Sequence, residues 1–162
     1  MSKEFTFNGQ RPDESVEEVC KNHPYVLLWP GVKTVLLFSI PVIILVFFGA
    51  STLFSVITFV CVILAFAIMS QAIYQYTSSV LIITSERVIY LEQKGFLVRK
   101  IIETSLDKIQ DVSSNTKGLI KISLDFGDLI IRTAGASQGT EMIIKNIAHP
   151  YEIQQEITKR TR

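Results

Sequence analysis

One uncharged stretch constrains this chain of 162 residues more than any other feature: residues 34–85 contain no Asp, Glu, Lys, Arg or His. A helix that crosses a bilayer needs about 20 mostly apolar residues, so this stretch has room for two helices and a short turn. The sequence Gly49-Ala50-Ser51-Thr52 is the natural break between them. We therefore predict a two-helix transmembrane hairpin over residues 32–76, with spans at about 33–48 and 53–73.

The residues around this hairpin predict its orientation. Basic side chains are retained on the cytoplasmic side, and here they lie before the first span (Lys21, Lys33) and after the second (Arg87, Lys94), whereas the connecting turn has no charge. A polar segment precedes the apolar run, which excludes a cleaved signal peptide. We expect a multi-pass protein of a prokaryotic inner membrane with both termini in the cytoplasm. Four aromatic residues are expected to anchor its ends at the headgroup level: Tyr25, Trp29, Tyr74 and Tyr76.

The first 31 residues form a polar segment before the hairpin. Asp13 is a plausible helix cap, and Val16, Val19 and Cys20 give the following residues one apolar edge. The pattern predicts a short amphipathic helix over about 13–21 that lies near the cytoplasmic membrane surface. The sequence His23-Pro24 is expected to end it.

Residues 77–162 have the pattern of a small β domain, in which short apolar runs alternate with turn signals. A helix is expected to begin at Pro150, with Ile153 and Ile157 on one face. This predicts a mainly-β domain of about seven antiparallel strands in a bent sheet or barrel, capped by a C-terminal helix. The expected strands are 79–83, 88–92, 97–103, 109–113, 119–124, 129–133 and 141–147, with polar turns at 115–118 and 135–139.

Periodicity alone fits several small barrels, and an ordered series of motifs narrows the choice. The motifs are LIITSERVIY (81–90), Lys94-Gly95, Arg99, SLDKIQDV (105–112), Gly118-Leu119, FGDLIIRTAG (126–135) and IAHPYEI (147–153). In this series the chain resembles the bacterial pleckstrin homology (PH) domain family, and in particular its membrane-anchored YdbS-like subgroup. The resemblance implies a PH-like fold behind two transmembrane helices, with Glu17 or Glu18 and His23 leading into the first span. It implies no defined activity.

We find no pattern that predicts an enzyme, a metal site or a cofactor. His23 and His149 are more typical of cap or interface positions than of catalysts, and no glycine loop suited to phosphate is present. Cys20 and Cys61 lie in the polar segment and in mid-membrane, so a disulfide between them is not expected. The net charge of +1, with mixed signs throughout, argues against a nucleic-acid partner, and no small-molecule substrate is evident.

These exclusions leave non-enzymatic binding or scaffolding at the cytoplasmic membrane face, by a homo-oligomer or with another membrane protein. Small residues in the spans favour close helix packing between subunits. The alternative is a sensor of anionic lipid headgroups that uses Arg87, Lys94, Arg99 and Lys100. A pore-forming or transport accessory oligomer is a further possibility. Salt separates the first two, because lipid attraction weakens at high ionic strength and an apolar interface does not.

Overall fold

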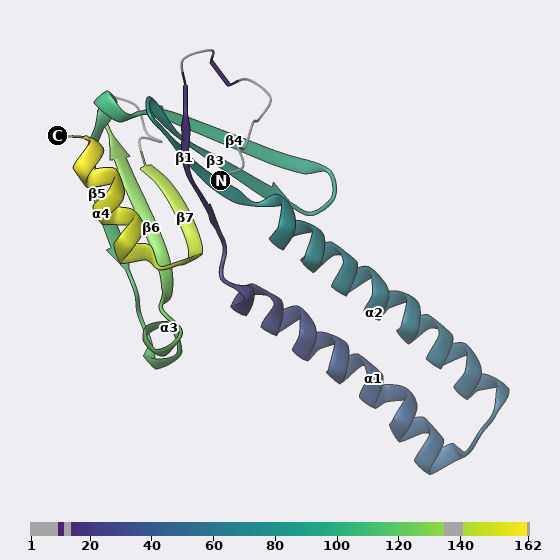
Figure 1. Cartoon of the computed structure of the whole chain (residues 1–162). Coiled ribbons are helices and arrows are strands. Elements are labelled where there is room, and N and C mark those ends of the chain that lie inside the picture. Colours follow the sequence, from purple (N-terminus) through teal and green to yellow (C-terminus); the bar gives the residue numbers. More distant parts are fainter. Residues whose placement is uncertain (1–9, 12–13, 135–140, 162) are drawn as a thin grey trace, which may run out of the picture.

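The chain passes from one strand through two long helices into six further strands and a closing helix (Figure 1). The computed structural model describes residues 10–11, 14–134 and 141–161. The strands are β1 (Val16–Lys21), β2 (Val80–Thr84), β3 (Arg87–Lys94), β4 (Val98–Ser105), β5 (Ile109–Asn115), β6 (Phe126–Thr133) and β7 (Glu141–Ala148). The helices are α1 (Leu28–Phe48), α2 (Thr52–Ser78), α3 (Leu119–Ser123) and α4 (Pro150–Arg160), with short 3-10 helices η1 (Pro24–Leu27) and η2 (Leu106–Lys108).

The helices α1 and α2 form the predicted hairpin, and its turn lies where the sequence placed it. Gly49 ends α1 with a positive φ of 68°, a conformation that glycine adopts at little cost. Ser51 caps α2, because its hydroxyl accepts a hydrogen bond of 3.3 Å from the backbone N–H of Phe54. Local chemistry at the break therefore fixes both helix ends.

Few side chains of the hairpin are buried. They are Pro41 in α1 and three small residues in α2, Cys61, Ala65 and Ala72. The large apolar side chains point outward instead: Phe47 is 76% exposed and Phe66 is 75% exposed. The hairpin thus has an apolar surface along most of its length.

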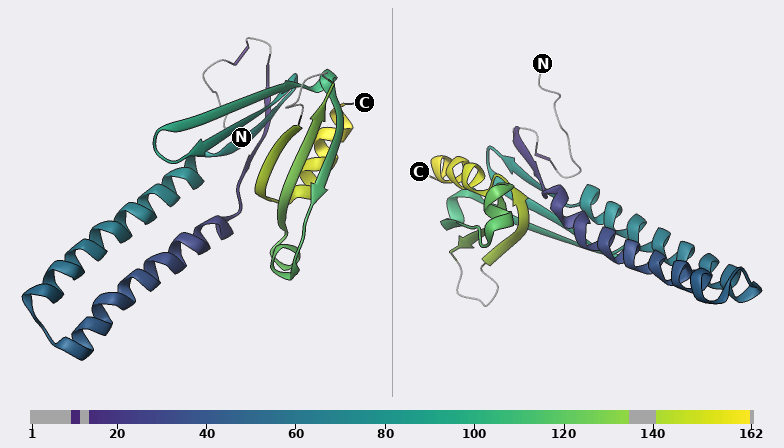
Figure 2. Two further views of the ribbon diagram at one scale, coloured as in Figure 1. Left: turned by 180° about the vertical axis from the view of Figure 1, so that it is seen from behind. Right: turned by 90° about the horizontal axis from the view of Figure 1, so that it is seen from below.

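The strands form two antiparallel sheets with the orders β1-β2-β3-β4 and β5-β6-β7. The end of β1 joins them, because Asn22 forms a bridge with Ile147 of β7 and the His23 N–H donates to the Asn146 carbonyl at 2.7 Å. Figure 2 shows the two sheets from behind, with the hairpin extending away from them. The predicted mainly-β domain of seven antiparallel strands is therefore confirmed in the form of two sheets, although one of the seven strands, β1, lies before the hairpin and outside the predicted range 77–162.

The core lies among the two sheets and α4. Ile153 and Ile157 of α4 are buried against it, as their spacing predicted, and Pro150 opens the helix. The Gln154 side-chain oxygen accepts hydrogen bonds from the Ser114 backbone and hydroxyl, which holds α4 against β5. The larger core residues from the sheets are Leu81, Ile83, Val88, Tyr90, Val112, Leu129, Ile131, Met142, Ile144 and Ile147.

The predicted amphipathic helix at 13–21 is wrong, because Val16–Lys21 forms strand β1. This strand pairs with β2, and a bulge between Val16 and Glu18 interrupts the alternation of its side chains. Cys20 is buried in the core, so residues 16–21 belong to the β domain and the hairpin is inserted between β1 and β2. The expected cap, Asp13, lies outside the described residues.

The predicted strand at 119–124 is also wrong, because residues 119–123 form the short helix α3. Strands β5 and β6 pair directly with each other, and Asn115 faces Asp128, so the chain between them has no strand partner. Its backbone groups form hydrogen bonds within the segment instead, and the Ile122 N–H donates to the Gly118 carbonyl at 3.1 Å. The turn predicted at 135–139 lies outside the described residues.

Candidate functional site

The hairpin and the β domain are coupled by very short connections. A single residue, Ser79, separates α2 from β2, and it is 4% exposed. Its hydroxyl accepts a hydrogen bond of 3.1 Å from the backbone of Gln93, whose side chain in turn donates to the Gly95 carbonyl at 2.9 Å. The end of α2 is therefore tied to the end of β3.

An aromatic stack fixes the other connection, where β1 leads into α1. The buried ring of Phe126, at the start of β6, lies 4.7 Å from the ring of His23 and 4.7 Å from that of Tyr25. The His23 and Phe126 rings are nearly parallel, with an interplanar angle of 8°. Stacked rings at this spacing add to the stabilisation from burial alone. The start of the hairpin is thus held against the three-stranded sheet.

A second aromatic contact lies beside α2. Tyr74, near the end of this helix, stacks on Phe96 with ring centroids 5.5 Å apart. Phe96 belongs to the β3–β4 turn (residues 95–97). A Cβ atom at Gly95 would lie 3.5 Å from the side-chain nitrogen of Gln71, so the turn runs close along the helix.

A polar cavity of about 240 Å³ lies at this junction. Two of its lining residues are lysines, Lys94 of β3 and Lys145 of β7, and Glu92 lies 3.4 Å from Lys94. Although Glu92 already pairs with one of the two lysines, the amides, hydroxyls and ammonium groups together suit a polar or anionic group of small size. Its other lining residues are Asn22, Val26, Gln75, Tyr76, Ser79, Tyr90, Gln93, Gly95 and Asn146.

The four basic residues singled out in the sequence do not form one cluster. Lys94, Arg99 and Lys100 lie near the β3–β4 turn, whereas Arg87 begins β3 at its opposite end, where it pairs with Ser105. Strand alternation further places Lys94 and Lys100 on one face of the β3–β4 pair and Arg99 on the other face. Lipid binding by these residues stays a prediction.

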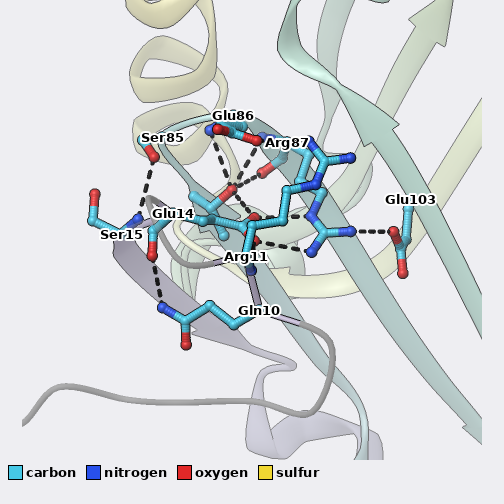
Figure 3. A network of polar contacts seen from close by, with 9 residues as sticks. Gln10, Arg11, Glu14, Ser15, Ser85, Glu86, Arg87 and Glu103 are labelled. Carbon is cyan, nitrogen blue, oxygen red and sulfur yellow. Dashed lines mark hydrogen bonds and ion pairs between the residues drawn. The ribbon is translucent and has the colours of Figure 1, made fainter.

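Arg87 has a different environment, a network that ties residues 10–11 and 14–15 to the first sheet (Figure 3). Its guanidinium donates to both carboxylate oxygens of Glu14, at 2.8 and 2.9 Å, and to Glu103 at 2.6 Å. Glu14 also accepts from the Thr84 hydroxyl at 2.7 Å and from the Arg11 backbone at 3.0 Å. Each carboxylate oxygen of Glu14 therefore accepts two hydrogen bonds, as a buried charge requires.

This environment changes the ionisation of Glu14. Hydrogen bonding from Arg87 lowers the pKa of Glu14 from 4.5 to about 2, although burial alone would raise it. The contribution to stability is on the order of 3 kcal/mol at neutral pH. The Glu14–Arg87 pair is therefore a structural clamp. The sequence offered no signal for it, because Glu14 precedes the helical hairpin in the sequence and Arg87 follows it.

The four aromatic residues predicted at the membrane interface lie at the domain end of the hairpin. Trp29 is 65% exposed in the first turn of α1, and Tyr74 is 41% exposed near the end of α2. Tyr25 and Tyr76 are half-buried, against Phe126 and in the polar cavity respectively. Sequence reasoning missed the ring contacts of Tyr25 with Phe126 and of Tyr74 with Phe96, because each contact joins residues that belong to different elements of the chain.

The described part of the chain holds no group of three His, Cys, Asp or Glu side chains placed to bind a metal ion. His149 does pair with Asp125 at 2.6 Å, but both side chains are more than half exposed. A larger cavity of about 400 Å³ is lined by α4 alone, at Tyr151, Gln154, Gln155, Thr158 and Lys159. It gathers no reactive group.

Comparison with known proteins assigns the fold. No curated protein matches the sequence. A solved structure, the crystal structure of a DUF1696 family protein with a pleckstrin-homology domain from Shewanella loihica PV-4, is similar at 16% identity and a TM-score of 0.40, over 52% of this chain and 71% of that one. Residues 35–161 match the bacterial PH domain family, a range that includes most of α1 and every element after it. The chain therefore belongs to the bacterial PH domain family.

Proposed function

We propose that this protein is a membrane-anchored PH module, in which α1 and α2 span the bilayer and the β domain binds a partner at the cytoplasmic face without catalysis. The observation that carries the proposal is the outward exposure of an uncharged hairpin. Only 6% of the most apolar stretch of the first helix and 11% of that of the second are buried. A core helix of a soluble protein would bury its apolar side chains, whereas lipid accepts them on every side.

The dimensions of the hairpin support this placement. At 1.5 Å per residue, α1 is about 31 Å long, which matches the hydrocarbon thickness of a bilayer. The longer α2, at about 40 Å, leaves its last turns outside the hydrocarbon. Those turns carry Tyr74 and Tyr76, the residue types that settle at the headgroup level.

The charge distribution supports a cytoplasmic β domain. Lys21 and Lys33 flank the start of the hairpin, Lys94 lies beside its end, and the turn at residues 49–51 is uncharged. Since β1 and β2 belong to one sheet, both ends of the hairpin must emerge on the same side of the membrane. Because lysine is retained on the cytoplasmic side, that side is the cytoplasmic one.

The partner that we propose is a second copy of the chain or another membrane protein. The exposed faces of α1 and α2 are available for lateral contacts, and two copies in one bilayer meet at high effective concentration. Native mass spectrometry of the full chain in nanodiscs, at low and high salt, tests this. A defined multimer that persists at high salt is expected, and a monomer under both conditions contradicts scaffolding by self-association.

A second function, recognition of an anionic lipid headgroup, is favoured by one observation. The polar cavity presents Lys94 and Lys145 close to the end of α2, where headgroups would lie under this proposal. In nanodiscs that contain phosphatidylglycerol, the variant Lys94→Glu/Lys145→Glu is expected to retain fewer anionic lipids than the unmodified chain. Lys108→Glu/Lys159→Glu changes the same number of charges at exposed sites away from the cavity and serves as the control. Equal retention in both variants contradicts headgroup recognition.

Alkaline carbonate extraction tests the anchoring itself. A protein held only by surface contacts is released from membrane fragments at high pH, whereas a spanning hairpin stays in the pellet. We expect the full chain to remain with the membrane fraction. Quantitative release would show that α1 and α2 do not span a bilayer.

A further inference from the structure

We propose that the β domain rests on the bilayer through two apolar contacts of its own, made by α3 and by the β3–β4 turn, which enter the interfacial layer on opposite sides of the hairpin. This inference rests on the proposed function, because it takes the hairpin as membrane-spanning. It adds a docked orientation of the domain, which anchoring alone does not require.

The first contact is α3, whose apolar side chains are left largely uncovered by the described residues. Leu119 is 85% exposed, Ile122 is 63% exposed, and Ile120 and Leu124 are each about half exposed. A five-residue helix with so much apolar surface is unusual in water. It resembles an interfacial element that buries its apolar face among lipids.

The position of α3 is fixed by contacts at its base. Phe126 begins β6, with two residues between it and the end of α3, and stacks on His23 and Tyr25, the residues that lead into α1. Asp125 and His149 also hold the base together, because the His149 backbone N–H donates to the Asp125 carbonyl at 3.0 Å and their side chains pair. In Figure 1, α3 projects from the end of the domain at which β1 leaves toward α1.

The second contact is the β3–β4 turn. Leu97 at its tip is 97% exposed, and its neighbours Phe96 and Val98 are 55% and 57% exposed. The stack of Phe96 on Tyr74 holds this turn beside the last turns of α2. The turn is therefore expected at the same depth in the membrane as Tyr74, which belongs at the headgroup level.

Charged groups near both contacts suit a mixed headgroup layer. Lys117 and Lys121 lie on the α3 side, where Lys121 pairs with Asp128 at 3.2 Å and Asp125 is close by. On the other side, Glu92 lies opposite Lys100 in the sheet and pairs with Lys94 at 3.4 Å. Because the signs are mixed, we expect apolar burial rather than net charge to dominate, so docking should persist at high salt.

Lipid is the occupant that fits both contacts at once. Figures 1 and 2 show α3 and the β3–β4 turn on opposite sides of the point where the hairpin leaves the domain. Lipid surrounds a spanning hairpin and is present on both sides of it, continuous with the surface that α1 and α2 expose. A protein partner would have to reach both tips around the hairpin.

The test uses the full chain in nanodiscs of phosphatidylethanolamine and phosphatidylglycerol, with an environment-sensitive fluorophore on one introduced cysteine at a time. Ile122→Cys and Leu97→Cys report on the two contacts, Val62→Cys on the middle of α2, and Gln110→Cys on an exposed strand position. The unmodified chain, whose two cysteines are buried, gives the labelling background. Lipids that carry a nitroxide near the headgroup or deep in the acyl chain supply the quenching.

We expect headgroup nitroxides to quench the labels at residues 122 and 97 several-fold more strongly than the label at residue 110, with blue-shifted emission at both contacts. Blue-shifted emission without quenching would mean that protein covers these residues, and an unshifted, unquenched label would mean that water does. Either result overturns the inference. Deep nitroxides must quench the label at residue 62, since failure there would instead overturn the proposed membrane span.

Discussion

Arg87 binds both carboxylate oxygens of Glu14, although the two residues are 73 positions apart in the sequence. The whole helical hairpin lies between them. Their ion pair therefore closes the β domain around the place where the chain leaves it and returns. It couples the segment before β1 to the start of β3.

Removing the charge of Glu14 is expected to destabilise the domain. In Glu14→Gln the Arg87 guanidinium loses its buried counter-ion, and breaking such a pair should lower the apparent Tm of the β domain by about 10–20 °C. Thermal unfolding of nanodisc samples, followed by the reaction of Cys20 with a thiol-reactive dye, measures this in a Cys61→Ala background. The control is Glu86→Gln, whose ion pair with Arg11 is largely exposed and should matter by less than about 1 kcal/mol. Equal shifts for both variants would contradict a structural clamp.

The same carboxylate predicts an acid limit of stability. Because the pKa of Glu14 is lowered from 4.5 to about 2 in the folded state, the unfolded chain binds a proton at a higher pH than the folded chain does. The stabilisation from Glu14 is complete above about pH 4.5 and is lost as the pH falls toward 2. The difference in Tm between the unmodified chain and Glu14→Gln should therefore shrink across this interval, and a constant difference would contradict the assignment.

Cys20 is expected to be inert in the folded domain. Burial, with a smaller effect of Glu18, raises the pKa of the Cys20 thiol to about 12, so almost no thiolate forms near neutral pH. Mass spectrometry after incubation with iodoacetamide should show an unmodified Cys20 until the domain unfolds. Fast alkylation of the native protein would mean that β1 detaches from the sheet.

A side chain at Gly127 is expected to destabilise the β domain. A Cβ atom there would lie 2.5 Å from the Thr116 hydroxyl oxygen and 2.9 Å from the Asn115 carbonyl oxygen. Since the carbonyl is backbone and cannot rotate away, Gly127→Ala should cost about 1–3 kcal/mol. Gly31→Ala is the matched control, because a Cβ atom at Gly31 meets nothing within 4 Å. A loss of stability as large in the control as at Gly127 would contradict this packing.

Local signals in the sequence predicted the helices and strands that have turn or cap residues at their ends. The break at Gly49 and Ser51, the strands from β2 onward other than the one expected at 119–124, and the helix at Pro150 follow from turn and cap residues beside apolar runs. The family resemblance pointed to the same fold, which the family match confirms.

The two wrongly predicted elements, at residues 16–21 and 119–123, show what local sequence signals cannot determine. Residues 16–21 and 119–123 have patterns that fit a helix and a strand, and the outcome depended on whether a neighbouring strand was available. For β1 the edge of β2 is open, and for α3 no edge is left between β5 and β6. The stack of His23 on Phe126 was equally hidden, because it joins residues more than a hundred positions apart.

Cysteine accessibility from the two sides of the membrane tests the central claim most directly. Ala50→Cys lies in the hairpin turn and Gln110→Cys on the β domain, and a membrane-impermeant maleimide reports which side each residue faces. The account predicts that intact spheroplasts are labelled only at residue 50 and inverted vesicles only at residue 110. Labelling of both residues from one side would show that the hairpin does not cross the membrane.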